Sequence, residues 1–271
     1  YYNYGIHRSV TGPSFEKSFL KVKGSSNLTP RFYVSASGSS GTLAAGDYLK
    51  DKLQTKIAVV EALECPTLLH GGYGEHNIQG IGDKHVPLIH NVMNTDFVVD
   101  VSDQATNNLN MIFNTEIGKN FLIEKKNFDP DFVSRLPEFG FSAIANILAS
   151  IKLAKYMDLN SDDAIITVAT DGADLYMSEL NKTIADFKNN YDEIVCAELF
   201  GQHLSGVSTD NMLELSHMDK KRIFNLGYFT WVEQQGVSLE EFEKRKDQKF
   251  WNSHYDYMLS LDNQIKEFNN M

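Results

Sequence analysis

Short runs of β-branched and aromatic residues alternate with helical patterns over the first two thirds of the chain. The clearest helical pattern spans 142–156, where apolar residues recur three and four positions apart, at Ile144, Ile147, Leu148 and Ile151. Four other runs have the composition of strands, at 31–35, 57–61, 96–101 and 164–169. Because strands that alternate with helices are typical of a parallel sheet covered by helices, we predict an α/β fold with a mostly parallel, twisted sheet.

After about residue 180 the pattern changes to charged helical segments that carry aromatic residues, and we predict no further strand. The last helix, at 248–268, has one apolar face, formed by Trp251, Tyr255, Met258, Leu261, Ile265 and Phe268. We therefore expect an α/β part at 1–180 and a helical C-terminal extension at 181–271. The apolar face of the last helix has to pack either on the body of its own chain or on a second copy.

Charge and cysteine content exclude several classes of protein. The chain has 271 residues, a net charge of −11 and no basic cluster, which argues against a nucleic-acid partner. No apolar run approaches the roughly 20 residues that a membrane span needs, and the first residues lack the pattern of a signal peptide. Two cysteines, Cys65 and Cys196, make no disulfide framework. We expect a cytoplasmic protein without a membrane partner.

A loop rich in glycine and hydroxyl groups, GSSGT at 38–42, lies between a predicted strand and a predicted helix. Backbone N–H groups at the start of a helix bind anions, so this loop suits a phosphate monoester. It is not an ATP-type phosphate loop, because Thr42 and Leu43 follow Gly41 where that motif requires a lysine. The dinucleotide pattern G-x-G-x-x-G fails as well. A flexible turn without a ligand is the alternative.

The loop and four other segments together resemble the fold-type II pyridoxal phosphate enzymes, most closely the cysteine synthase and cystathionine β-synthase family. In chain order the segments are GIHRSVTGPSF at 5–15, GSSGT at 38–42, VVEALECPTLLHGGYGEHNIQGIGDKHVP at 59–87, GFSAIANILASIKLAK at 140–155 and TDGADLYMSE at 170–179. Five segments in the right order are far more specific than any one of them. The resemblance covers about residues 5–179 and implies a fold like that of the tryptophan synthase β subunit.

The resemblance also implies pyridoxal 5′-phosphate as the cofactor. Its phosphate would be held by the loop residues Gly38, Ser39, Ser40, Gly41 and Thr42, with Gly80 passing close to the cofactor. Ser40 stands where the family has a glycine, which makes one backbone approach more crowded. The pyridine nitrogen would lie near Thr170 and Asp171. We prefer Asp171 for this contact, and the alternative is that Asp171 points to solvent or caps a turn before Gly172.

The activity implied by the resemblance is β-elimination or β-replacement on a small amino acid such as serine, O-acetylserine or cysteine, in a homodimer. The family's Schiff-base lysine lies in a segment with no counterpart here, so the catalytic residues stay unassigned. We expect this chain to be part of a longer or two-chain protein and to be inactive alone. The alternative function is a non-catalytic scaffold that keeps the large-domain fold and binds a partner.

Four histidines raise the question of a metal site: His70, His76, His85 and His90. Their spacing gives no helical pair such as H-E-x-x-H, and the family segment accounts for His76 without a metal, so we predict no metal centre. Cys65 precedes a proline and has no base beside it in the sequence. We interpret it as a turn residue and not as a nucleophile.

Overall fold

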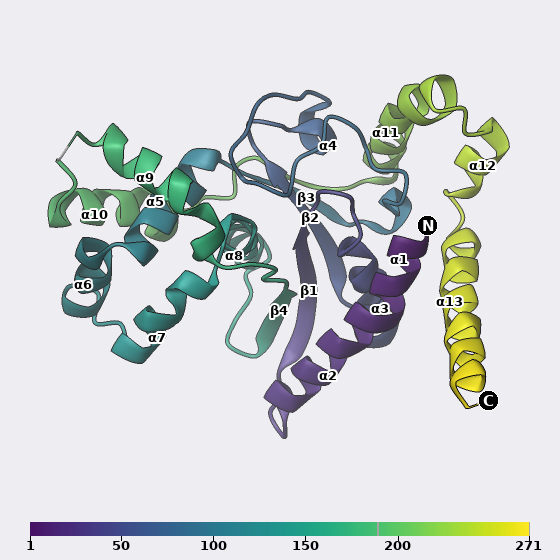
Figure 1. Ribbon diagram of the computed structural model, residues 1–271, viewed down its shortest axis with the longest axis horizontal. Helices are drawn as coiled ribbons and strands as arrows, with labels where there is room; N and C mark the ends of the chain where they lie inside the picture. The colour runs from purple at the N-terminus through teal and green to yellow at the C-terminus, as the bar shows by residue number, and fades with distance from the viewer. Residues whose placement is uncertain (189, 271) are drawn as a thin grey trace.

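The computed structural model describes residues 1–188 and 190–270, and its centre is a five-stranded sheet with the order β4-β1-β2-β3-β5 (Figure 1). Four of these strands run parallel: β1 (Thr29–Ala36), β2 (Lys56–Ala62), β3 (Phe97–Val101) and β4 (Asp163–Thr167). Helices cover both faces of the sheet, as a parallel sheet requires. The predicted α/β class with a mostly parallel sheet is therefore confirmed.

The prediction that no strand follows residue 180 is wrong. β5 (Met212–Glu214) pairs antiparallel with β3 at the edge of the sheet, with Leu213 opposite Val98. Three residues are too few to produce the two-residue alternation by which a strand is recognised in a sequence. The four predicted strands all exist, and their ends differ from the predicted ends by two residues at most.

The helices account for most of the remaining chain. The N-terminal helix consists of α1 (Tyr2–Ile6), a π-helical turn (His7–Thr11) and α2 (Gly12–Lys23). The others are α3 (Leu43–Leu53), α4 (Thr67–His70), α5 (Asp103–Asn114), α6 (Glu116–Glu124), α7 (Pro130–Arg135), α8 (Phe141–Tyr156), α9 (Met177–Asp186), α10 (Glu193–Phe200), α11 (His217–Tyr228), α12 (Leu239–Lys244) and α13 (Gln248–Asn269). Two further π-helical turns follow α10 and α11, at Gly201–Ser205 and Phe229–Gln234. No helix of the described part is both long and apolar enough to cross a membrane.

The main core lies between the sheet and α8, whose ends match the predicted helix at 142–156 closely. α8 buries alanines as well as large apolar residues, among them Ala145 and Ala149 beside Ile144 and Leu148. The small side chains let the helix approach β1 closely, where Phe32 and Val34 complete the cluster. On the opposite face α3 packs on β1 and β2. Helices therefore pack on both faces of β1, the strand that leads into the loop at 38–42.

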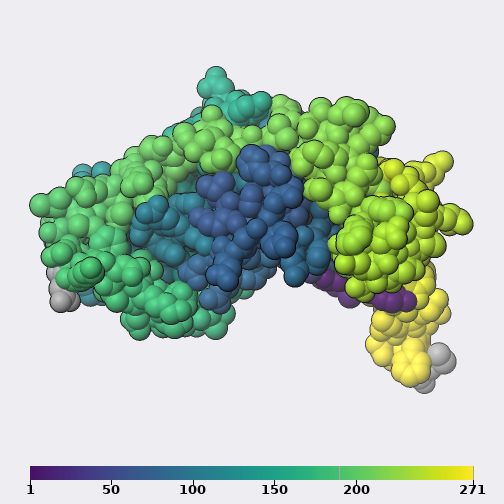
Figure 2. All heavy atoms as spheres, turned by 90° about the horizontal axis from the view of Figure 1, so that it is seen from above, coloured from purple at the N-terminus to yellow at the C-terminus, as the bar shows by residue number. Residues whose placement is uncertain are grey.

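The helices after residue 180 pack on the rest of the chain. α9 and α10 contact α5, and α13 runs beside α1 (Figure 1). Trp251 on α13 is fully buried against Tyr4 and Ala44. We predicted that the apolar face of the last helix packs either on its own chain or on a second copy. Its own chain covers the first turns of this face. The far end of α13 projects from the body, and Ile265 and Phe268 there are exposed (Figure 2).

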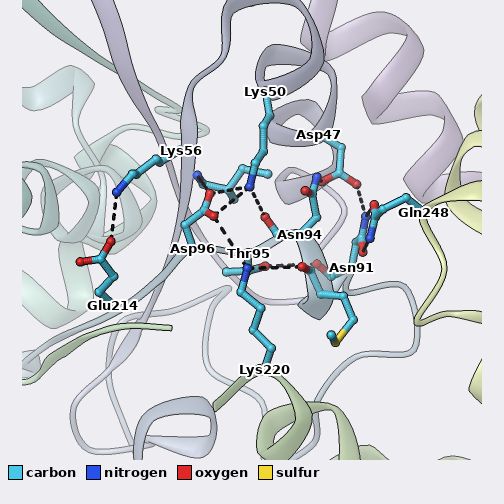
Figure 3. A network of polar contacts seen from close by, with 12 residues as sticks. Asp47, Lys50, Lys56, Asn91, Asn94, Thr95, Asp96, Glu214, Lys220 and Gln248 are labelled. Carbon is cyan, nitrogen blue, oxygen red and sulfur yellow. Dashed lines mark hydrogen bonds and ion pairs between the residues drawn. The ribbon is translucent and has the colours of Figure 1, made fainter. Parts of the chain in front are cut away.

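Polar contacts also join the later helices to the sheet. Figure 3 shows Asp96, just before β3, held by Lys50 of α3, with the Lys220 ammonium of α11 3.8 Å away. The Lys56 ammonium donates to Glu214 of β5 at 3.0 Å. Most of these charges are partly exposed, so each pair contributes only about 0–1 kcal/mol to stability. Two of these contacts, made by Glu214 and Lys220, join the segment after residue 180 to the residues of the sheet and its ends.

Candidate functional site

The glycine loop at 38–42 connects the end of β1 to the start of α3, as predicted. None of the backbone N–H groups of residues 38–42 has an acceptor within the described residues, whereas the neighbouring Ser37 N–H donates to the Val60 carbonyl at 2.9 Å. The Thr42 hydroxyl is turned toward Ser35, with the two oxygens 2.7 Å apart. The loop thus presents a set of unpaired donors at the positive end of a helix dipole, which is the arrangement that binds an anion.

Ser40 adopts a backbone conformation that favours glycine. Its φ is +66°, and it is almost completely buried, with its hydroxyl oxygen 2.8 Å from that of Ser37. A left-handed conformation costs an ordinary residue about 1 kcal/mol or more. This explains why glycine suits the position in the family pattern. The hydrogen bond to Ser37 offsets part of the cost.

A second loop, at 79–82, crosses the first one backbone against backbone. A Cβ atom added to Gly38 would lie 2.4 Å from the Gly80 carbonyl oxygen. The Gly82 N–H donates to the Ser37 carbonyl at 2.9 Å, and Gly80 and Gly82 both have positive φ. Gly38 therefore allows a contact that any side chain would block.

A third wall comes from the start of α8 and the segment after β4. The Asn146 amide donates through Nδ2 to the Val168 carbonyl at 2.8 Å. The hydroxyl oxygens of Ser142 and Thr170 lie 3.3 Å apart. The Tyr176 hydroxyl donates to Oδ2 of Asp171, and Oδ1 is buried. No backbone N–H of the described residues donates to this carboxylate, so it neither caps a turn before Gly172 nor points to solvent through Oδ1.

These three walls enclose one cavity of about 160 Å³. All eight residues predicted for the site line it: Gly38, Ser39, Ser40, Gly41, Thr42, Gly80, Thr170 and Asp171. Ser39, Gly80 and Thr170 are exposed and form part of its rim. Gln79, next to Gly80 in the segment that the resemblance places close to the cofactor, also lines it, and so do His7, Ser142 and Asn146, which the sequence analysis did not single out. Each lies in or beside a segment that the family resemblance covers, but the sequence does not show which of its residues face inward.

The cavity carries little formal charge. Among its lining residues Asp171 is the only acid, and no lysine or arginine is present. Burial lowers the pKa of His7, whose Nδ1 lies 3.0 Å from the Thr11 hydroxyl, so this ring is neutral at pH 7. An anion bound here would therefore interact with backbone dipoles and hydroxyl groups instead of with side-chain cations.

The histidines considered for a metal site lie apart in separate contacts. His76 contacts the Ile81 carbonyl at 2.5 Å, His85 contacts Thr230 at 3.1 Å, and His90 is buried against Thr95 at 3.0 Å. Within residues 1–188 and 190–270, no group of three or more histidine, cysteine, aspartate and glutamate residues is arranged to hold a metal ion. Cys65 is buried, with its sulfur 3.9 Å from the Thr67 hydroxyl.

Known proteins resemble this chain over part of its length. No family model matches the chain. Over 148 residues, or 54% of the chain, the sequence is 33% identical to cysteine synthase B of Campylobacter jejuni, of which the match covers 42%. Over the matched residues the sequence is therefore similar to the cysteine synthase family of fold-type II pyridoxal phosphate enzymes.

Two solved structures show the same fold. One is a hydrogen sulfide-producing enzyme from Fusobacterium nucleatum, with a TM-score of 0.53, 22% identity and coverage of 78% of this chain and 55% of that one. The other is a cysteine synthase from Entamoeba histolytica, with a TM-score of 0.52, 22% identity and coverage of 74% and 53%. The chain therefore spans about half the length of the relatives that it matches.

Proposed function

We propose that this chain forms the pyridoxal phosphate-binding part of a cysteine synthase-like enzyme that catalyses β-elimination or β-replacement on a small amino acid. Serine, O-acetylserine and cysteine are the substrates that we consider. The observation that carries the proposal is the set of unpaired backbone N–H groups at 38–42, which lie at the start of α3 and line a cavity. The match to cysteine synthase B supports the choice of reaction class.

The residues present fit the cofactor. Gly38, Ser39, Ser40, Gly41 and Thr42 would bind its phosphate through their N–H groups, while Gly80 closes the cavity from the second loop. When bound, pyridoxal phosphate supplies an electron sink for charge that develops on the amino acid. This chain's share is to bind the phosphate, to orient the ring between the loops and α8, and to exclude water from the buried side.

The proposal assigns the Schiff-base lysine to a different segment or chain. No lysine of residues 1–188 and 190–270 lines the cavity. We therefore expect that this chain alone binds the cofactor but releases no pyruvate from serine or cysteine. Borohydride reduction in the presence of pyridoxal phosphate, followed by peptide mapping, tests this expectation. One dominant labelled lysine within this chain, together with turnover, would contradict it.

Phosphate binding is tested by equilibrium dialysis of pyridoxal phosphate against the chain and the variant Ser39→Asp. The variant places a carboxylate on the rim, beside the unpaired N–H groups, and we expect at least about tenfold weaker binding, or about 1.4 kcal/mol. Ser26→Asp, at an exposed loop outside the cavity, is the matched control and should bind as the wild type does. No saturable binding by the wild type would contradict the proposal and favour the non-catalytic scaffold.

A further inference from the structure

The segment at 71–91 carries one wall of the cavity but contains no helix or strand. Its residues 79–81 line the cavity, and the Gly82 N–H donates to the Ser37 carbonyl at 2.9 Å. Stretches of this length without secondary structure are uncommon in compact domains. Because the 71–91 segment has no ladder of hydrogen bonds of its own, contacts with other elements determine its shape. The wall at 79–81 is therefore only as well placed as the two ends of the segment.

The 71–91 segment follows α4, which is held at both of its ends. α4 has only four residues, too few to pair most of its terminal N–H and carbonyl groups. The N–H groups of Leu68 and Leu69 donate to the Glu61 carboxylate of β2. The carbonyls of the same two residues accept from Nη2 of Arg222, at 2.8 and 3.1 Å. Arg222 of α11 therefore supplies the donors at the end of α4 from which the segment starts.

The later part of the segment is held by the π-helical turn that follows α11. Nε1 of Trp231 donates to the Val86 carbonyl at 2.7 Å. The hydroxyl oxygen of Thr230 lies 3.1 Å from Nδ1 of His85. Thr230 and Trp231 are adjacent residues of the turn Phe229–Gln234, and π-helical turns are rare and occur frequently at functional sites. The turn therefore contacts the segment shortly after the residues that line the cavity.

Apolar packing joins the same elements. Leu68, beside the start of the segment, and Val86, in its later part, are buried in one cluster with Ile223 and Phe224 of α11. Trp231 packs against this cluster. One stretch of the chain, residues 222–231, therefore holds the segment on both sides of the wall at 79–81, although none of its residues lines the cavity.

We propose that Arg222 and Trp231 are positioning residues, which hold the wall at 79–81 in place for the ligand of the cavity. The inference rests on the proposed function, since it takes pyridoxal phosphate as that ligand. A wall that is held in the free protein need not be ordered when the ligand binds, whereas a loose wall leaves only a fraction of the molecules ready to bind. The apparent affinity falls by that fraction. The helical C-terminal extension thus acts on the site through the 71–91 segment without contacting the ligand.

Hydrogen exchange of the free protein, followed by mass spectrometry, measures how firmly the segment is held. Arg222→Met keeps most of the apolar stem but removes the donors to α4, so we expect faster exchange at 76–86. In equilibrium dialysis, pyridoxal phosphate should bind this variant about fivefold more weakly. Arg222→Lys restores a donor and should bring both values back toward those of the wild type. Lys221→Met, at the exposed neighbouring position of α11, is the matched control and should behave as the wild type does.

A second ligand separates positioning from general damage to the fold. Inorganic phosphate needs only the unpaired N–H groups at 38–42, on the loop between β1 and α3, so Arg222→Met should change its affinity by less than about twofold. Trp231→Phe removes the donor to Val86 but keeps an aromatic ring. It should give the same pattern, and it keeps the inference testable if Arg222→Met fails to fold.

Exchange at 76–86 that is as slow in Arg222→Met and Trp231→Phe as in the wild type would overturn the inference, because the segment would then keep its shape without these donors. Faster exchange with an unchanged affinity for pyridoxal phosphate would overturn it too. So would an equal loss of affinity for pyridoxal phosphate and for inorganic phosphate, which general damage to the fold would explain. In each of these cases the proposed function stands. No saturable binding of pyridoxal phosphate to the wild type overturns the proposed function and this inference together.

Discussion

The pH dependence of folding stability should reveal a pair of buried carboxyl groups on neighbouring strands. Glu61 of β2 lies directly opposite Asp100 of β3 in the parallel register, and they are 3% and 0% exposed. Both oxygens of Glu61 accept from the backbone of α4, at Leu68 and Leu69. Neither carboxylate oxygen of Asp100 receives a hydrogen bond from an N–H or O–H group of the described residues. A proton shared by the two carboxyl groups gives Asp100 a hydrogen bond with Glu61.

The direction of the effect follows from where that proton is bound. Burial and the neighbouring Glu61 carboxylate raise the pKa of Asp100, and burial raises the pKa of Glu61. In the unfolded chain both groups titrate near pH 4. The folded protein therefore holds at least one extra proton above that pH. The stability contributed by the pair is fully present below the unfolded pKa and is lost as the pH rises toward the folded one.

The expected magnitude is large enough to measure. One extra proton in the folded state lowers the free energy of unfolding by about 1.4 kcal/mol for each pH unit. From pH 5 to pH 8 this amounts to about 4 kcal/mol. Asp100→Asn removes one of the two ionisable groups at nearly constant volume and leaves Glu61 free to ionise on the N–H groups of α4. The variant should therefore lose stability with pH more slowly than the wild type.

Urea unfolding followed by tryptophan fluorescence at pH 5, 6, 7 and 8 measures the two slopes. Asp162→Asn, at an exposed position near the start of β4, is the control and should give a slope parallel to that of the wild type. The reasoning would be refuted if Asp100→Asn and the wild type lost stability at the same rate over this range. A wild type that became more stable relative to Asp100→Asn as the pH rose would refute it too.

Two further substitutions test the packing described above. Trp251→Ala removes a fully buried ring and should lower the free energy of unfolding, measured in urea, by about 3–5 kcal/mol. Phe268, on the same helix, is 73% exposed, so Phe268→Ala should change this free energy by less than about 0.5 kcal/mol. If both variants lowered the free energy of unfolding equally, the first turns would not anchor α13. Gly38→Ala places a Cβ atom 2.4 Å from the Gly80 carbonyl oxygen and should weaken pyridoxal phosphate binding at least about tenfold in equilibrium dialysis. Gly72→Ala, with no atom within 4 Å of the added Cβ, should bind as the wild type does, and an unchanged affinity of Gly38→Ala would contradict the close crossing of the two loops.

The sequence predicted the parts of the fold that carry a long or strongly biased pattern. The four parallel strands and α8 are such parts, because each buries a face or a whole segment in the core. β5 has only three residues and is held by its pairing with β3, which is a tertiary effect that local composition does not report. The packing of Trp251 against Tyr4 likewise joins segments almost the whole chain apart.

The candidate site was predictable in its composition but not in its hydrogen bonding. Glycine and hydroxyl residues between a strand and a helix indicated an anion-binding loop, and the family segments indicated which other residues to consider. Whether the N–H groups at 38–42 are paired depends on the surrounding backbone, and the sequence cannot show it. Asn146 was missed because a single polar residue in an apolar helix faces the core or a cavity according to how that helix packs.

The contact between α1 and α13 makes the order of synthesis matter for folding. Tyr4 is completely covered only when Trp251 packs on it, and the Arg8 guanidinium donates to Asn252 at 2.8 Å. At about 5–20 residues per second, Trp251 leaves the ribosome roughly 10–50 s after Tyr4. During that interval the apolar side of α1 lacks its final cover, although β1, β2 and α3 are already complete. The nascent chain therefore exposes an aromatic surface beside its unfinished site until the last helix is synthesised and packs on α1.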